Sequence, residues 1–310
     1  MNTNRLDMIT NIATMYYEEN KTQTYIANSL GLSRPTVAQM LQEARDIGIV
    51  KISVVKKTNS SKDLSETIKE KYRLKNIFVA PQDATNPKYE IGVICADYIE
   101  NKKNENLKIG IGFGSTVHEF IKSANYLNTN FDIITPLIGG VDLKNEALHS
   151  NYMCFQLANK YSCGVSFFYA PVMADTIEQK EAFIKSSLVQ SSLEKAKCVD
   201  VAIFGVGNPL IDSAFQRLYY ISEDDAQVLK DKNVVGDIAS TFFNNKAESV
   251  NTPASNKFIG LTLSDLEKIN DVVVLASGSH KKFAINALLN KKIINTLIID
   301  YELAEALEKL

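Results

Sequence analysis

A turn rich in glycine and hydroxyl groups lies in the segment 107–117, which reads LKIGIGFGSTV. The apolar residues before it predict a buried strand, and a Gly-Phe-Gly triplet then allows the backbone to turn sharply. Ser115 and Thr116 follow at the predicted start of a helix, where backbone N–H groups and the helix dipole favour an anion. The pattern is typical of a phosphate-binding loop, although both hydroxyls would also suit simple helix capping.

Four further polar turns follow apolar runs along the chain, at Gly139-Gly140, Gly205 to Pro209, Gly236-Asp237 and Ser277 to Lys281. Ligands of an open parallel sheet bind beyond the carboxyl ends of the strands, so these turns are predicted to converge on one polar pocket. Lys281 opens a predicted helix, where a cation is unfavourable unless it faces an anion. The Asp237 carboxylate would accept hydrogen bonds from sugar hydroxyls or, alternatively, cap a helix.

Other chemistries find less support in the residues. The histidines, His118, His149 and His280, have no metal-ligand spacing, and the four cysteines form no C-x-x-C pair, so neither a metal site nor a cofactor is expected. A dinucleotide site requires G-x-G-x-x-G, whereas this loop has G-x-G-x-G. Isomerisation of a sugar phosphate requires a positioned acid and base. Asp237, His118 and Asp300 are candidates, but no acid–histidine pair stands out.

The elements that would position these turns alternate between apolar strands and amphipathic helices from residue 63 to the end of the sequence. Such alternation predicts an α/β domain with a mostly parallel sheet. The predicted strands include residues 233–240 (NVVGDIAS) and 257–261 (KFIGL), and the predicted helices include residues 115–123, 148–161 and 281–289.

The first fifty residues predict a helix-turn-helix. One amphipathic helix covers about residues 7–20, Thr22 caps a second helix that ends at Gly31, and Ser33 caps a third helix with Pro35 in its first turn. Residues 49–55 alternate like a strand and would form a wing. A protein-interaction domain of three helices is the alternative. Nine residues are predicted to contact DNA bases or phosphates: Thr22, Gln23, Ser33, Arg34, Thr36, Gln39, Gln42, Arg45 and Lys51.

Composition agrees with two domains. The chain of 310 residues has 45% hydrophobic and 23% charged residues, which suffices for a large core. Residues 1–57 carry a net charge of +2 and the remainder −4, a mild asymmetry that favours binding of two copies to a two-fold DNA site. Residues 1–56 are predicted to bind DNA, 57–62 to form a linker and 63–310 to bind an effector and oligomerise. No membrane or signal segment is evident, and a cytoplasmic location is expected.

The chain resembles the SorC-type (SorC/DeoR) sugar-binding transcriptional regulators through its helix-turn-helix and the segments IGIGFGSTV, PLIGG, YAPV, FGVGNP, VVGDIAS, LASGSHKKFAINALL and NTLIIDYELAEAL. The resemblance implies a winged helix-turn-helix joined to a Rossmann-like effector domain similar to glucosamine-6-phosphate deaminase and ribose-5-phosphate isomerase. It also implies a dimer or tetramer whose operator binding responds to a phosphorylated sugar or polyol. An enzyme of the isomerase or deaminase type with a DNA-binding appendage is the alternative function.

The resemblance, together with the turns above, assigns thirteen residues to the effector: Gly112, Phe113, Gly114, Ser115, Thr116, Gly139, Gly140, Asn151, Gly207, Asn208, Arg217, Asp237 and Lys281. Two positions depart from the family pattern. Ile138 stands where some relatives carry a lysine that forms a Schiff base, so no covalent imine is expected. Phe113 stands where tryptophan is frequent, and the chain has no tryptophan.

Overall fold

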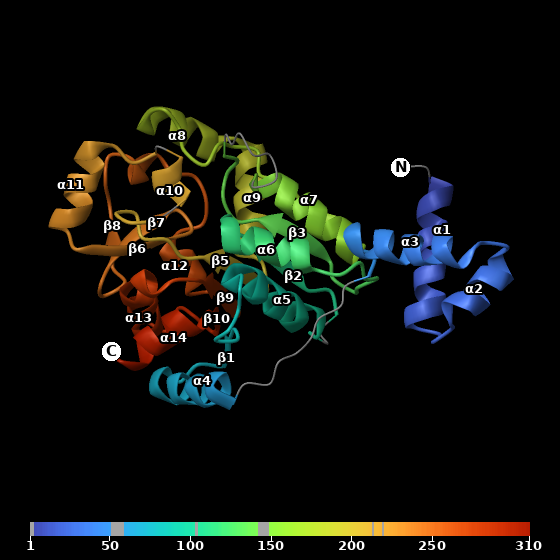
Figure 1. The fold of residues 1–310 in the computed structure, drawn as a ribbon. Coiled ribbons are helices and arrows are strands. Elements are labelled where there is room, and N and C mark those ends of the chain that lie inside the picture. The colour runs from blue at the N-terminus through green and yellow to red at the C-terminus, as the bar shows by residue number, and fades with distance from the viewer. Residues whose placement is uncertain (1–2, 51–58, 103–104, 142–148, 213, 219) are drawn as a thin grey trace. The chain divides into compact units, whose positions relative to one another are not determined.

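The computed structural model describes residues 3–50, 59–102, 105–141, 149–212, 214–218 and 220–310 (Figure 1). Contacts within the chain divide it into two compact units, residues 1–56 and 57–310. Within the described residues, no helix is both long enough and apolar enough to cross a bilayer.

The smaller unit contains three helices, α1 (Thr3–Tyr17), α2 (Gln23–Leu30) and α3 (Arg34–Asp46). The predicted caps are present. The Thr22 hydroxyl accepts from the Tyr25 N–H at 3.2 Å, and the Ser33 hydroxyl accepts from the Thr36 N–H at 3.2 Å. Gly31 ends α2 with a φ of +67°, a conformation that is easy only for glycine. The apolar stripes of the three helices share one small core.

The larger unit is built on a seven-stranded sheet whose neighbouring strands all pair in parallel. In spatial order the strands are β1 (Asn76–Val79), β10 (Thr296–Ile299), β9 (Asp271–Ala276), β5 (Val201–Gly205), β2 (Lys108–Ile111), β3 (Ile133–Pro136) and β4 (Gly164–Val165). The interior strand β9 is buried at every position, as expected of a sheet covered on both faces.

Helices cover both faces of this sheet (Figure 1). One face packs on α5 (Pro87–Glu100), α6 (Ser115–Ser123) and α7 (Ser150–Tyr161). The other packs on α4 (Asn59–Tyr72), α9 (Ser187–Lys197), α13 (Lys282–Asn290) and α14 (Tyr301–Glu308). The short helix α12 (Leu263–Leu266) adds two leucines to the core on this second face. Outside these layers lie α8 (Ile177–Lys185), α10 (Ala214–Arg217) and α11 (Glu223–Asp231).

A second sheet departs from the prediction. Residues 234–238 form a strand, β6, but it pairs antiparallel with β7 (Thr241–Asn244), which pairs with β8 (Ser249–Val250). Ala239 and Ser240 connect β6 and β7, and Ala239 has a φ of +53°. The hairpin lacks the Asn-Gly type of turn that would mark it in the sequence. The strand predicted at residues 257–261 is reduced to two isolated bridges, Ile138 with Gly260 and Met173 with Phe258.

Candidate functional site

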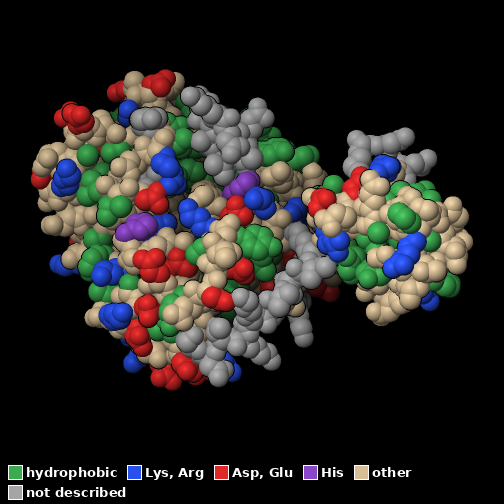
Figure 2. All heavy atoms as spheres, in the orientation of Figure 1, with side chains coloured by type: hydrophobic (Ala, Val, Ile, Leu, Met, Phe, Trp, Pro, Cys, Tyr) green, Lys and Arg blue, Asp and Glu red, His purple; other side chains and the backbone are tan. Residues whose placement is uncertain are grey.

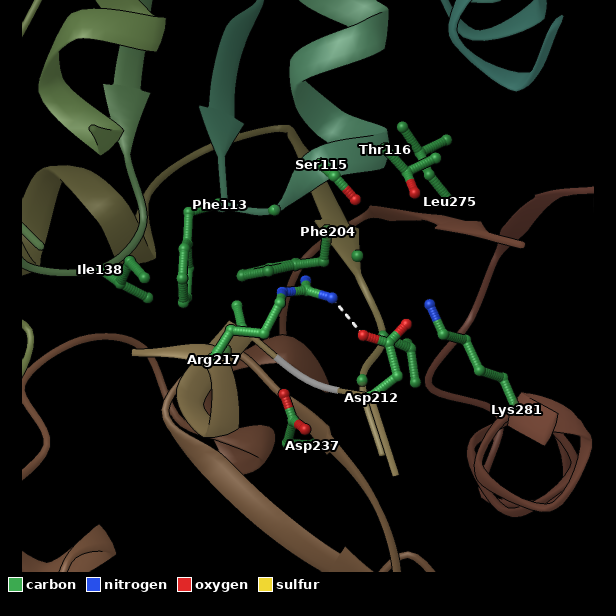
Figure 3. A pocket seen from close by; sticks show the side chains of 16 residues that line it. Phe113, Ser115, Thr116, Ile138, Phe204, Asp212, Arg217, Asp237, Leu275 and Lys281 are labelled. Carbon is green, nitrogen blue, oxygen red and sulfur yellow. Dashed lines mark hydrogen bonds and ion pairs between the residues drawn. The ribbon is translucent and has the colours of Figure 1, made fainter. Parts of the chain in front are cut away.

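A pocket of about 530 Å³, including its mouth, lies beyond the carboxyl ends of β2, β5 and β9 (Figure 3). The turn after β2 contributes Phe113 to Thr116. The end of β5 contributes Phe204 to Gly207, β6 contributes Asp237, and the turn after β9 contributes Lys281. Four of the five polar turns predicted from the sequence thus contribute to this pocket, whereas Gly139 and Gly140 are not among its lining residues. The parallel strands β2, β5 and β9 place their carboxyl ends at one edge of the sheet, and Asp237 reaches the same place from the antiparallel strand β6.

The turn between β2 and α6 has the geometry of an anion loop. Gly114 occupies the N-cap position of α6 with a φ of +133°, and no side chain caps this helix. Ser115 is the first residue of α6, and its hydroxyl accepts a hydrogen bond from the Lys88 ammonium at 3.1 Å. Simple capping, the alternative role for Ser115 and Thr116, is therefore not what the geometry shows. Both residues line the pocket at the positive end of the helix.

Lys281 is the N-cap residue of α13 and is buried, with only 7% of its surface exposed. Within the described part of the chain, no hydrogen bond or ion pair within 4 Å engages its ammonium. Burial lowers the pKa of Lys281, an effect that the Asp212 carboxylate opposes and the Lys88 ammonium reinforces. A buried cation without a direct partner, pointing into a pocket, is poised for an anionic ligand (Figure 3).

A single carboxylate supports the turn that carries Lys281. Asp300 accepts from the Ser277 hydroxyl at 2.6 Å and from the Gly278 N–H at 2.7 Å, and it caps α14 by accepting from the Leu303 N–H at 2.8 Å. Gly278 has a φ of +101°, so the turn also depends on glycine. Asp300 was considered in the sequence as an acid–base group, but its contacts are those of a buried structural acceptor.

Arg217 lies in the pocket and forms an ion pair with Asp212 (Figure 3). The Asp212 carboxylate also lies 3.8 Å from Nε2 of His280. Arg217 was predicted from the family resemblance alone, whereas Asp212 was missed because it belongs to an irregular segment between β5 and α10. The guanidinium is a further cation beside the anion loop, and its partner carboxylate is half-exposed at the same opening.

Asp237 is buried and lines the pocket, but it lies within β6 rather than in a turn. The alternative that it caps a helix is wrong. Its backbone is fixed by a two-way bridge with Gly207, with N···O distances of 3.0 Å in both directions. This bridge holds the small sheet against the end of β5 and aims the Asp237 side chain at the pocket.

Several predicted effector residues lie outside the described pocket lining and serve the framework. A Cβ on Gly139 would lie 2.3 Å from the Pro171 carbonyl oxygen, and one on Gly140 would lie 2.9 Å from the His149 ring. Asn151 donates to the Phe168 carbonyl at 3.1 Å and accepts from its N–H at 2.8 Å. Gly112 packs against Phe204, and the Asn208 side chain accepts from the Leu210 N–H. Close packing and turn formation thus explain these five residues.

Other lining residues were not anticipated. Phe204 and Leu275 end buried strands and read as core in the sequence, while Ile138 was considered only for the lysine that it replaces. Lys88 was also missed, although a lysine in the first turn of a helix is the same signal that singled out Lys281. Among the residues that the structure describes, no group of three His, Cys, Asp or Glu side chains is placed to hold a metal ion.

The smaller unit presents most of the residues predicted to contact DNA on one helix. Arg34, Gln39 and Gln42 are exposed on α3. Arg45 donates to the Tyr17 hydroxyl at 3.0 Å and to the Gln42 amide oxygen at 2.6 Å. Gln42 in turn donates to Asp46 at 2.8 Å. The network orients the C-terminal half of the polar face. Residues 51–55 of the predicted wing, including Lys51, lie outside the described residues, and the two described residues of the wing, Ile49 and Val50, are not in a strand.

Comparisons with known proteins match the whole chain. The family model described as "Putative sugar-binding domain" matches residues 56–308. The deoxyribonucleoside regulator of Bacillus subtilis (strain 168) is 28% identical over 298 residues, which cover 95% of each protein. The solved full-length sorbitol operon regulator SorC from Klebsiella pneumoniae is 27% identical over 98% of both chains, with a TM-score of 0.78. A DeoR family transcriptional regulator from Listeria monocytogenes is 31% identical, with a TM-score of 0.74, over 80% of this chain and 100% of its own.

These relatives are named as transcriptional regulators rather than enzymes, so the isomerase or deaminase alternative is set aside. The sugar-binding model covers the unit that holds the pocket, and the full-length structural match extends over the three N-terminal helices as well. The chain belongs to the SorC-type family of sugar-binding transcriptional regulators.

Proposed function

We propose that the pocket of the larger unit binds a phosphorylated sugar or polyol, and that this effector modulates the binding of operator DNA by α3. The observation that carries the proposal is Lys281, a buried cation that has no direct partner among the described residues and lines the same pocket as the anion loop of α6. A phosphate group could bind Lys281 and the anion loop at once, because it accepts hydrogen bonds from backbone N–H groups, hydroxyls and the ammonium.

The remainder of the pocket suits a polyhydroxylated body. The buried carboxylate of Asp237 would accept from sugar hydroxyls, and Phe113 and Phe204 would contact the apolar face of the ring or chain. In Figure 3, Arg217 and its ion-pair partner Asp212 lie between Asp237 and Ser115. Ile138 offers no amine, so a reversible, non-covalent complex is proposed.

Operator binding is proposed for α3 and the start of α2. Gln39 lies on the face of α3 opposite its buried stripe, and Arg34 and Thr36 lie in the first turn of the same helix. A helix in the major groove presents its N-terminal residues to the base edges. Acidic and basic side chains are mixed over the visible face of the larger unit (Figure 2), so that face offers no extended basic surface for DNA. The protein is proposed to act in the cytoplasm as a dimer or tetramer, so that two copies of α3 reach the two halves of a symmetric operator.

The test is a titration of operator DNA, selected from a random library with the full-length protein, in the presence of a panel of phosphorylated and unphosphorylated sugars. A phosphorylated member is expected to change operator affinity, and its unphosphorylated form is expected to act far more weakly. Ser115→Ala should preserve operator affinity and diminish the response. A response to the unphosphorylated sugar alone, or an undiminished response in S115A, contradicts the placement of the phosphate.

A further inference from the structure

Lys88 is a second lysine placed at the positive end of a helix, opposite the anion loop. It is the second residue of α5, after the cap Asn86 and Pro87 at the first helical position. A cation in this position is destabilising, because it faces the unpaired N–H groups of the first turn. Its ammonium reaches across to another helix and donates to the Ser115 hydroxyl at 3.1 Å.

The packing of α5 on α6 holds Lys88 in this place. Both helices follow parallel strands and run back along the same face of the sheet, so both begin at its carboxyl edge. Gly92 lies against the backbone of α6, where an added Cβ would be 2.6 Å from the Glu119 carbonyl carbon. The absence of a side chain at Gly92 allows the two helices to approach closely, and their N-termini converge beside the pocket.

The contact with Ser115 leaves hydrogen-bonding capacity unused at the same point. An ammonium has three donors, of which one is accounted for by the Ser115 oxygen. Ser115 accepts this bond, so its own hydroxyl hydrogen remains available to donate. Both groups can therefore donate to one anion seated on the loop.

The charges around the loop support an anion with more than one negative charge. Lys88, Arg217 and Lys281 are basic, whereas Asp212 and Asp237 are acidic, and all four of the others act electrostatically on Lys281. The local formal charge is thus +1, to which the positive ends of α5 and α6 add. Only 7% of the Lys281 surface is exposed, so its charge is poorly screened by solvent.

From this geometry we infer that Lys88 is a ligand-binding residue of the effector site, which grips the phosphate from the side opposite Lys281. The inference rests on the proposed function and deepens it. Two ammonium groups and the Gly114–Thr116 loop enclose the phosphate, so the site selects a phosphate dianion over a singly charged carboxylate. Lys88 is supplied by α5, an element that the pocket lining itself does not include.

The test measures binding of inorganic phosphate and of the phosphorylated sugar found active in the operator titration, by isothermal calorimetry on the full-length protein. Lys88→Gln is expected to weaken both about ten- to a hundredfold, the loss of one charge-assisted hydrogen bond. Lys88→Arg, which retains the charge, should lose no more than a few fold. Lys122→Gln is the matched control, since Lys122 lies at the other end of α6, is 58% exposed and pairs with Glu119; it should bind like the wild type.

A double-mutant cycle separates direct contact from a merely structural role. If Lys88 only orients Ser115, Lys88→Gln has no further effect in a Ser115→Ala background, and the inference is overturned. Direct contact predicts that Lys88→Gln lowers the phosphate affinity further in that background. It also predicts that the phosphate affinity of K88Q depends less on salt than that of the wild type. Folding of K88Q is expected to be intact, because the substitution removes a cation from a helix N-terminus; its melting temperature checks this.

The two levels of the proposal fail differently. If the wild-type protein binds neither inorganic phosphate nor any phosphorylated sugar, the proposed function falls and the role of Lys88 with it. If the wild type binds them and K88Q binds equally well while S115A does not, the phosphate site stands and the assignment of Lys88 is wrong.

Discussion

Replacing Lys281 by methionine is expected to stabilise the protein and to abolish its response to the effector. Methionine has nearly the length of lysine, but no charge, and fits a site that is almost fully buried. The pKa of Lys281 is lowered by burial, despite the attraction of Asp212. The surroundings as a whole therefore disfavour the charged form of this side chain in the folded protein without ligand.

The size of the gain follows from the cost of a buried charge. Exchanging buried ionic groups for apolar ones of similar volume often stabilises proteins by about 1–4 kcal/mol. Attraction from Asp212 and Asp237 offsets part of that cost here, so we expect about 1–2 kcal/mol for Lys281→Met. For a unit of about 250 residues this corresponds to a rise in melting temperature of roughly 2–4 °C.

The dependence on pH gives an independent check. The folded-state pKa of Lys281 is below the ordinary value of 10.5, so between the two values the unfolded chain binds more protons. The destabilisation by the Lys281 charge is fully present below the folded-state pKa and is relieved as pH rises from that pKa toward the ordinary value. The wild type should therefore gain stability relative to K281M in alkaline solution, and the difference between the two should shrink.

Thermal unfolding with and without effector measures both consequences. At a ligand concentration of about 100 Kd, the wild type should gain roughly 2.7 kcal/mol of stability, whereas K281M should gain almost nothing. Lys282→Met is the control, since the neighbouring lysine does not line the pocket. A K281M protein that is less stable than the wild type without ligand, or that responds equally to effector, would refute the reasoning.

Three further outcomes are expected. Gln39→Ala should weaken operator binding by about 1–3 kcal/mol at one base pair, measured by anisotropy on single-base operator variants; an equal loss on every variant would contradict base contact. Asp300→Asn should lower stability by about 1–3 kcal/mol in denaturant unfolding, because a carboxylate with three buried donors is lost, and should also weaken phosphate binding. Phosphate affinity, measured by calorimetry across pH, should fall in alkaline solution as Lys281 loses its proton, and at a lower pH than for an ordinary lysine. Lys281→Arg should flatten this fall, because arginine keeps its charge. A pH profile that is the same in K281R and the wild type argues against contact between Lys281 and the phosphate.

Much of the fold was predictable because local signals agreed with tertiary structure. Caps at Thr22 and Ser33, the left-handed Gly31 and the glycine-rich ends of buried strands all form as the sequence indicates. The antiparallel sheet of β6 to β8 was not predicted as a separate sheet, because the Ala239-Ser240 turn lacks the Asn-Gly type of hairpin signal and the buried run of β6 resembles those of the main sheet.

The site was predictable where a residue type conflicts with its local position. Lys281 at a helix start is such a conflict, and it lies in the pocket. Gly139 was assigned from its turn and from the family resemblance, and Asn151 from the resemblance alone. Close packing against Pro171 accounts for Gly139, and backbone hydrogen bonds to Phe168 account for Asn151. Sequence patterns do not distinguish a glycine needed beside a ligand from one needed beside another strand. Asp212 was not predicted because it lies in an irregular segment, where no helix or strand periodicity indicates which way a side chain points.

The close packing at Gly92 gives the pocket one rigid wall. Because α5 rests directly on the backbone of α6, Lys88 and Ser115 share one frame and keep their spacing when a ligand arrives. Arg217 and Asp212 line the same pocket and are joined by an ion pair between their side chains. We therefore expect α5 and α6 to keep their positions when an effector binds, while Arg217 and Asp212 move to accommodate it. A conformational change in the rest of the protein would then begin at α10.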